Sequence, residues 1–436
     1  FFDIGSVPTQ LNVGLRYDKQ NGTQNPSNIP GAPANSNPDV NLPPVSFSGK
    51  DLGFDWTTIT PRLGFTWAFN EGKSLVRGGY SQYADQLGTS TANWTNPFYW
   101  IAYQYTWYED TNGDRDPDVD ELFGNLGTAY FDPRFPDQAV PINTVDPDLD
   151  APLTDEFTVG IEHSLLPEFT VGAGYTYRTQ EVLTSDLLVF DNQAMYDAGG
   201  TGRRATRNDY YLAGTVEGTL RDGTTYVQPY WDLNEDLITN NGFYLYNAGT
   251  TSTYSGFELF AVKRLSNNWM MRFNFNWNTW KWNTDQNDIS DPNFVRSGFT
   301  EDGSDRLVQS TGSGNKGDIW MGSSAWQYNL TGLYQVAPDR VWGFNLGASI
   351  YGREGYAAPY YHRRTGNTGT YQYIRLTPDT TTETYPDVHM MDLRVEWPFT
   401  FGVNTLTLSV DCFNVFNTGK TLQRELRLNT GRADYL

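Results

Sequence analysis

The sequence predicts an all-β fold, an antiparallel transmembrane β-barrel with long loops at one end of its strands. Three observations favour this fold. No run of about 20 apolar residues, the length of a membrane-spanning helix, occurs among the 436 residues. Aromatic residues make up 15% of a chain that is only 38% hydrophobic, as in barrels where every second strand residue faces lipid. Segments of alternating polarity are joined by connections that alternate between short and long.

The segment Trp269–Lys281 shows the strand pattern most clearly. Its apolar face comprises Trp269, Met271, Phe273, Phe275 and Trp277, and its other face comprises Met270, Arg272, Asn274, Asn276 and Asn278. At roughly 3.3 Å per residue, the first face is about 26 Å long, and a tilt of about 40° reduces this to about 20 Å along the membrane normal. That length is close to the ~25 Å apolar band of outer-membrane barrels.

The same alternation predicts eleven strands. They lie near residues 9–19, 56–69, 74–84, 153–165, 168–180, 251–264, 268–281, 324–336, 340–352, 386–398 and 404–417. Short connections at 70–73, 166–167, 265–267, 337–339 and 399–403 alternate with long ones such as 19–55, 85–152 and 181–250. Outer-membrane barrels have short periplasmic turns and long extracellular loops, so this alternation favours a membrane barrel over a soluble sandwich or propeller. The strand-like segment 98–108 lies inside a long connection and is interpreted as loop β-structure or an aromatic patch.

Side-chain parity predicts the two faces of the wall. Phe273, Phe275, Phe344, Leu346, Leu393 and Val395 are expected to face lipid, and Arg272, Asn274, Asp392 and Arg394 to face the lumen. Tryptophan prefers the depth of the lipid headgroups. We therefore expect Trp56, Trp67, Trp269, Trp342 and Trp397 at the periplasmic interface, and Trp277 and Trp326 toward the outer one.

Composition excludes several classes of function. The formal charge of −21, from 51 acidic and 30 basic residues, argues against nucleic acid as a partner. The single cysteine, Cys412, excludes an internal disulfide and a cysteine-rich metal site, and its parity places it on the lipid face. His163, His362 and His389 are far apart, and no Ser or Cys nucleophile matches them by spacing. We therefore expect no enzyme.

Two loop segments carry clustered charge. In the first, oxygen-bearing side chains match the ligand positions of a calcium-binding loop, namely Asp110, Asn112, Asp114, Asp116, Asp118 and Glu121. Arg115 stands where that loop type has Gly, so a calcium ion and a solvated acidic run both remain open. In the second, Arg363 and Arg364 follow His362, and we interpret them as solvated loop charge in preference to an anion site.

Several phrases, in order along nearly the whole chain, carry a family resemblance. They are LNVGLRYD (Leu11–Asp18), TPRLGFTW (Thr60–Trp67), VRGGYSQYA (Val76–Ala84), DEFTVGIEHSL (Asp155–Leu165), YSGFELFAVKRLSNNW (Tyr254–Trp269) and LSVDCFNVFNTGK (Leu408–Lys420). Together they resemble the distal barrel of TonB-dependent receptors, in particular the large-looped Oar-like branch. The most specific of them is the last, with its Phe-Asn-x-Phe-Asn core.

The resemblance implies a 22-stranded barrel of the cell outer membrane, closed by an N-terminal plug and energised through a TonB box. Residues 1–436 are then the C-terminal part of that barrel, and the plug and first strands are absent from this sequence. The implied partners are outer-membrane lipid, the TonB system and proteins at the extracellular loops. The lumen-facing charges expected to hold the plug or the wall together are Arg16, Arg62, Arg178, Glu258, Arg272, Asp392, Arg394 and Glu396.

Three functions remain open at this point. The first is TonB-dependent uptake of an unidentified substrate through the plugged barrel. The second is surface adhesion, assembly or export through the large extracellular loops, and the third is a passive porin. Eleven strands cannot close a single-chain barrel with an even strand number. We therefore expect an open half-barrel in which strands 9–19 and 404–417 are unpaired at their outer edges or paired to another polypeptide.

Overall fold

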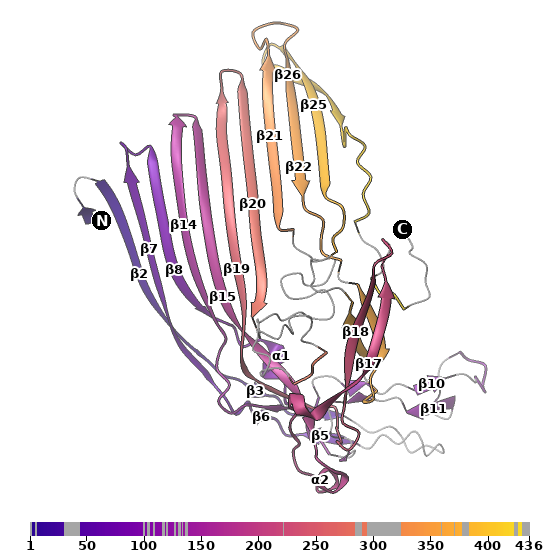
Figure 1. Cartoon of the computed structure of the whole chain (residues 1–436). Coiled ribbons are helices and arrows are strands. Elements are labelled where there is room, and N and C mark those ends of the chain that lie inside the picture. Colours follow the sequence, from indigo (N-terminus) through magenta and orange to yellow (C-terminus); the bar gives the residue numbers. More distant parts are fainter. Residues whose placement is uncertain are drawn as a thin grey trace.

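The computed structural model is dominated by one large antiparallel sheet. It describes residues 2–4, 7–29, 44–98, 101–102, 105–107, 110–115, 118, 121–125, 128–129, 132, 134–135, 138–220, 222–283, 290–293, 324–358, 360–369, 371–376, 383–422 and 426–429. The sheet has 14 strands, and its main path runs β1-β2-β7-β8-β14-β15-β19-β20-β21-β22-β25-β26. Figure 1 shows this path as a curved wall that follows the order of the chain.

All eleven predicted strands form, in the predicted order. The wall strands are β1 (Phe2–Ile4), β2 (Val7–Gln20), β7 (Trp56–Phe69), β8 (Ser74–Ala84), β14 (Leu153–Leu166), β15 (Phe169–Val189), β19 (Phe243–Ser266), β20 (Trp269–Asn283), β21 (Trp326–Val336), β22 (Phe344–Arg353), β25 (Val388–Phe401) and β26 (Asn404–Cys412). The short turns gather at one end of the wall and the long connections at the other (Figure 1). The prediction of an all-β antiparallel barrel wall with long loops at one end is confirmed.

The strand register brings the apolar residues of neighbouring strands onto one face. Phe275 of β20 pairs with Leu259 of β19 and Tyr328 of β21. Leu346 of β22 pairs with Val395 of β25. The exposed large apolar side chains of this face include Leu11, Val13, Leu63, Phe65, Phe157, Val159, Leu259, Leu408 and Val410. An apolar face this broad is the surface that a barrel presents to lipid.

The opposite parity carries the polar side chains. Arg272 pairs with Val262 and Thr331, and Asn274 with Phe260 and Asn329. Arg394 pairs with Gly347 and Asp411. The charged set therefore lies on the face opposite the apolar one, as the alternation predicts.

The tryptophans follow the prediction with one exception. Trp67, Trp269, Trp342 and Trp397 lie in or close to the short turns, and Trp277 pairs with Trp326 nearer the long loops. Trp56 was expected at the periplasmic interface, and this is wrong. It is the first residue of β7, a strand that runs from the long loop toward the short turn, so it lies at the loop end. It is 1% exposed there, and its indole Nε1 donates to the Leu149 carbonyl at 3.0 Å.

The long connections contain their own secondary structure. Their elements are β3 (Thr23–Gln24), β4 (Ser27–Ile29), β5 (Val45–Phe47), β6 (Lys50–Asp51), α1 (Thr89–Ala92), β9 (Ile101–Ala102), β10 (Tyr105–Trp107), β11 (Leu122–Asn125), β12 (Thr128–Ala129), β13 (Thr144–Val145), α2 (Gln193–Asp197), β16 (Arg203–Arg204), the 3₁₀ turn η2 (Arg207–Asp209), β17 (Tyr210–Thr219), β18 (Thr225–Leu233), β23 (Tyr361–Thr365) and β24 (Tyr371–Arg375). Strands β9 and β10, from segment 98–108, pair only in small loop sheets among the described residues, so this segment is loop β-structure as expected. No helix in the described ranges has the length and apolarity to cross a membrane.

The buried apolar cores lie in the long connections and in the strand segments at the loop end of the wall. One cluster comprises Trp56, Leu149, Ala151 and Leu245; a second comprises Val189, Ala205 and Leu233; two more surround the hairpins β17–β18 and β23–β24. Side chains of the membrane wall face outward or into the lumen, so they form no such core. The loops therefore fold as packed structures in their own right.

The two edges of the wall are open, with one difference from the prediction. Strand β26 pairs with β25 alone in the part of the chain that is described. Strand β2 was expected to have an unpaired outer edge, but over Val7–Thr9 that edge pairs with β1. The prediction missed this because β1 is only three residues long and shows no alternation.

Candidate functional site

The lumen face of the wall is held together by paired charges. Arg77 pairs with Glu162, and Arg178 pairs with Glu156. Arg394 pairs with Glu396 at 2.6 Å and with Asp411 at 3.2 Å. These contacts bridge neighbouring strands or successive lumen-facing positions. For Arg178, Arg394 and Glu396, the structure thus provides the wall network that the sequence analysis considered.

A depression of about 420 Å³ lies in this face where glycines replace side chains. Gly64, Gly160, Gly174 and Gly256 contribute to its lining. A second depression of about 440 Å³ adjoins it toward the loops, lined by Glu156, Thr158, Thr176, Arg178, Gln180, Ser252, Tyr254 and Trp280. The lining consists of glycine backbone, aromatic rings and the Arg178–Glu156 ion pair. Such a polar surface is expected of a water-filled lumen.

At the loop end of the wall, two hairpins of the long connections pack against each other. One is β17–β18, from the connection between β15 and β19, and the other is β23–β24, from the connection between β22 and β25. Val216 of β17 packs with Ile374 and Leu376, which are 0% exposed. We call this pair of hairpins the loop module.

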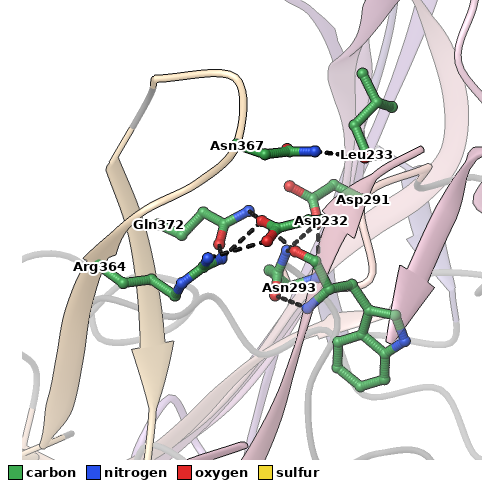
Figure 2. Close-up of polar contacts among 8 residues, drawn as sticks. Asp232, Leu233, Asp291, Asn293, Arg364, Asn367 and Gln372 are labelled. Carbon is green, nitrogen blue, oxygen red and sulfur yellow. Dashed lines mark hydrogen bonds and ion pairs between the residues drawn. The ribbon is translucent and has the colours of Figure 1, made fainter. Parts of the chain in front are cut away.

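A polar clamp fastens the two hairpins at one point (Figure 2). The Arg364 guanidinium donates to both carboxylate oxygens of Asp232, with Nη1 at 2.6 Å and Nη2 at 2.9 Å. Gln372 Nε2 donates to the Trp231 carbonyl at 3.0 Å and to Asp232 at 3.3 Å. Asn367 Nδ2 donates to the Leu233 carbonyl at 2.6 Å. A bidentate arginine–carboxylate pair is among the strongest polar contacts in proteins.

The clamp perturbs the acidity of both its charged groups. Burial raises the pKa of Asp232, but the hydrogen bonds and charge of Arg364 outweigh burial, so the pKa is lowered overall. The hydrogen bond to Asp232 raises the pKa of Arg364. Asp232 is 5% exposed, so removal of either partner leaves the other charge poorly solvated.

A third loop reaches the same clamp. The Trp231 amide donates to Asn293 Oδ1 at 3.0 Å, and Asn293 Nδ2 donates to the Trp231 carbonyl at 2.8 Å. Asp291 accepts from the Asn293 amide at 2.8 Å, as Figure 2 shows. The pKa of Asp291 is raised to about 6. Burial is the main cause, and the nearby carboxylates of Asp232 and Asp186 raise it further.

Asp186 anchors the third loop to the wall. It lies in the part of β15 that extends beyond the predicted strand, and it is 3% exposed. Its carboxylate accepts from Ser290 Oγ at 2.7 Å, from Tyr246 Oη at 2.6 Å and from Arg204 Nε at 2.5 Å. Contacts from three long connections therefore meet at two buried carboxylates.

The proposed calcium ligands lie in a separate loop. Asp110 accepts from the amides of Gly113 and Arg115, and Arg115 has a positive φ of 65° at the position where calcium loops have Gly. Glu121 is 1% exposed and accepts from Thr111. Asp116 lies outside the described residues. Among the residues that the structure does describe, no group of three or more His, Cys, Asp or Glu is placed to hold a metal ion. Calcium binding stays a prediction.

The remaining sequence candidates are dispersed. His163 lies near the β7–β8 turn, with Nδ1 at 2.8 Å from Ser74 Oγ. His389 stacks with Trp326 at a ring distance of 5.7 Å, and burial lowers the pKa of His362 in β23. Cys412 is exposed and pairs with Leu393 of the apolar face. The structure does not bring these residues together.

No sequence pattern pointed to Asp232 or Asp186, and Arg364 was expected to be solvated loop charge. A signal for the hairpin was present, because Asp222-Gly223 stands between two strand-like runs, a typical hairpin turn. No local pattern links Asp232 to Arg364, which is 132 residues away in the sequence.

Comparisons with known proteins give one family and several solved structures. The family model described as "Outer membrane beta barrel domain" matches residues 9–327. The outer membrane transporter YddB from Escherichia coli is 14% identical, with a TM-score of 0.45 over 100% of this chain and 50% of that one. The FrpB iron transporter from Neisseria meningitidis is 10% identical, with a TM-score of 0.44 over 94% and 39%. The siderophore receptor PiuA from Acinetobacter baumannii is 11% identical, with a TM-score of 0.42 over 94% and 37%.

No curated protein matches the chain. The chain spans half or less of the length of the three solved structures. The family match covers well over half of the chain and most of the wall strands. It concerns membrane barrels and not enzymes, in agreement with the strand pattern and the two faces of the wall. The chain therefore belongs to the outer membrane β-barrel domain family, and it is a protein of the outer membrane.

Proposed function

We propose that this chain forms part of the wall of a TonB-dependent outer-membrane transporter that takes up an unidentified substrate through a plugged barrel. The observation that carries the proposal is the pairing of a charged, glycine-indented lumen face with a clamped loop module beyond it. The loop module holds the substrate at the outer end, and the lumen face provides a polar path. A passive porin needs the path but has no use for a clamped binding surface.

The TonB step and the assignment to the Oar-like branch rest on the sequence phrases, above all LSVDCFNVFNTGK at Leu408–Lys420. In that scheme a 22-stranded barrel holds a plug, and energy from the inner membrane displaces it. The plug then contacts lumen-facing charges such as Arg16, Arg62 and Glu258.

A second candidate is a surface adhesion, assembly or export protein that acts through its loops. The observation that favours it is the packing of the loops, which contain buried apolar clusters of their own. In this case a protein partner binds the loop module, and the lumen serves the partner's assembly or remains closed.

Depletion of solutes from a defined medium tests the proposal. Cells carrying the full-length protein are compared with cells lacking it, each with and without an active TonB system. The proposal expects at least one solute whose depletion requires both the protein and TonB. Depletion that is independent of TonB contradicts the proposal, as does unchanged depletion of every solute. Loss of cell–cell or cell–surface attachment without any change in depletion supports the second candidate instead.

A further inference from the structure

The β23–β24 hairpin has two faces with different environments. His362, Arg364, Gln372 and Ile374 share the face that packs on β17–β18. The pairs Arg363↔Tyr373, Thr365↔Tyr371 and Tyr361↔Arg375 form the opposite face. We call Tyr361, Arg363, Tyr371, Tyr373 and Arg427 the tyrosine–arginine face.

A third strand extends this face. Residues Leu426–Asn429 run parallel to β23, where the Tyr361 amide donates to the Leu426 carbonyl and the Leu428 amide donates to the Tyr361 carbonyl, both at 3.0 Å. The bridge partner of Tyr361 is Arg427, so both side chains lie on the same face. Leu426 points the other way and is 2% exposed in a loop core. The added strand therefore fixes the backbone under the tyrosine–arginine face.

The rings on this face are ordered by one another. Tyr361 and Tyr373 form an edge-to-face pair with ring centroids 5.7 Å apart. The Arg363 guanidinium carbon lies 4.3 Å from the Tyr371 ring centroid, a cation–π contact. Tyr371 is 60% exposed, so a ring of this cluster is open to a ligand.

Arg363 differs from its neighbour Arg364 in its hydrogen bonds. Arg364 donates to Asp232 and Gln372, whereas no carboxylate or carbonyl oxygen in the described part of the chain accepts from the Arg363 guanidinium. Its Nε is buried without a hydrogen-bond partner. A buried donor without an acceptor is unfavourable, and acidic residues outnumber basic ones by 51 to 30 in this chain. No acidic side chain in the described part of the chain pairs with Arg363. Its guanidinium is therefore available to donate hydrogen bonds to a ligand.

We propose that the tyrosine–arginine face binds a carboxylate carried on a six-membered ring. The Arg363 fork donates to the carboxylate, and the ring lies against the exposed Tyr371 and its neighbour Tyr373. This inference deepens the proposed function, on which it rests, by giving the chemical class of the substrate or of its terminal group. A planar fork matches a carboxylate better than a point charge does, and aromatic side chains provide offset stacking for a ring.

The charge of the chain selects a small ligand over a polymer. The formal charge is −21, and acidic residues are dense in the long loops at 110–121 and 146–155. A long polyanion bound at Arg363 would be repelled by many loop carboxylates along its length. A ligand with a single carboxylate is repelled less, because charges beyond about 8 Å are screened at physiological salt. The face therefore fits a ligand with one anionic group beside one ring.

Binding to the purified full-length protein in detergent tests the inference. The probes are benzoate, with an aromatic ring, and glucuronate, with a sugar ring; benzyl alcohol and glucose are their uncharged counterparts. Ligand-detected NMR titration is expected to show that one of the two carboxylates binds and that its uncharged counterpart does not. Preference for benzoate assigns an aryl acid, and preference for glucuronate assigns a uronic acid. Absence of binding by both carboxylates overturns the inference.

Three variants localise the site. Arg363→Gln is expected to weaken binding about tenfold or more, the loss typical of one charged hydrogen bond. Arg363→Lys keeps the positive charge but lacks the planar fork of the guanidinium. Its affinity for the ligand should therefore lie between the affinities of Arg363→Gln and the wild type. Lys19→Gln is the matched control, because it removes one positive charge from an exposed surface pair with Asp55, and it should bind normally. Amide exchange of β23–β24 is measured in each variant as a folding check. If Arg363→Gln and Lys19→Gln bind equally, the inference is wrong.

The binding assay separates this inference from the proposed transport, because it needs no cells and no TonB. Binding that depends on Arg363, without TonB-dependent depletion of the ligand by cells, retains the site and contradicts the transporter. TonB-dependent uptake of another solute, with no binding of ring carboxylates, retains the transporter and contradicts the site.

Discussion

Loss of the Asp232 carboxylate should release the two hairpins of the loop module from each other. The change is Asp232→Ala, which removes both hydrogen bonds from Arg364, at 2.6 and 2.9 Å, and the weaker one from Gln372 at 3.3 Å. The membrane wall is not involved in these contacts. The expected result is therefore local opening of the two hairpins, while the sheet of the wall stays intact.

The magnitude follows from the burial of the pair. Removal of one partner of a buried ion pair typically costs about 3–5 kcal/mol, because the other charge stays buried. The Arg364 side chain keeps 21% of its surface exposed, so water stabilises part of its charge. We expect a local destabilisation of about 2–3 kcal/mol, or about 30- to 150-fold in the opening equilibrium.

Hydrogen–deuterium exchange with mass spectrometry measures this opening strand by strand. Amides of β17, β18, β23 and β24 should exchange about 30- to 150-fold faster in Asp232→Ala, whereas amides of β20 in the wall should not change. Asp236→Ala is the matched control. It removes a carboxylate four residues further along the chain that is exposed to solvent, and it should exchange like the wild type.

A double-mutant cycle checks that the effect comes from the pair. Asp232→Ala and Arg364→Ala together should destabilise by clearly less than the sum of the two single changes, because the double variant leaves no buried charge. The reasoning is refuted if the two effects add, or if Asp232→Ala exchanges no faster than Asp236→Ala.

Three further predictions concern the wall, the acidic loop and pH. Leu330→Arg, in the middle of the apolar face, should destabilise the barrel by about 2–4 kcal/mol and lower its level in the outer membrane, whereas Thr331→Arg on the lumen face should not; equal loss in both variants contradicts the face assignment. If the acidic loop binds calcium, calorimetric titration should show binding that Asp110→Asn and Glu121→Gln each abolish, and wild-type protein that binds none excludes the site. Because the pKa of Asp291 is raised to about 6 from an ordinary 3.8, its charged form destabilises the contact of the third loop with the clamp above about pH 6. That penalty disappears as the pH falls toward 4, so protection around Asp291, taken as the exchange rate relative to the intrinsic amide rate at each pH, should increase over this window; a flat protection profile, or one unchanged in Asp291→Asn, counts against the assignment.

The wall was predictable because its signals are local. Period-two alternation in Trp269–Lys281 gave β20, which the structure extends only to Asn283. Turn lengths then gave the orientation of each strand, because all the short turns lie at one end. The same rule places Trp56 at the loop end, because β7 begins after a long connection and ends at a short turn.

The extensions of the wall beyond the membrane were not predictable by the same route. The sequence suggested strand ends near residues 180 and 251, whereas β15 continues to Val189 and β19 begins at Phe243. The pairing shifts register between Glu181 and Leu183. Such an irregularity reverses the parity of the side chains, so the alternation breaks where the strands leave the lipid.

The packing of the loop module could not be predicted from a single sequence. Each hairpin has local signals, but their packing depends on Asp232, Arg364 and Asn293 from three separate connections. Nothing in the spacing of these residues indicates that they meet. The contrast between Arg363 and Arg364 is of the same kind, because adjacent residues on a strand point to opposite faces with different neighbours.

The lengths of β15 and β19 set the height at which this protein meets its surroundings. Strand β19 has 24 residues, and about 11 tilted residues are enough to cross the apolar band. At roughly 3.3 Å per residue and a tilt of about 40°, the rest reaches roughly 30 Å beyond the membrane. A diffusing molecule therefore encounters a rigid platform well before it reaches the lipid surface. Antibodies or phages directed at this protein should find fixed backbone there instead of a flexible fringe.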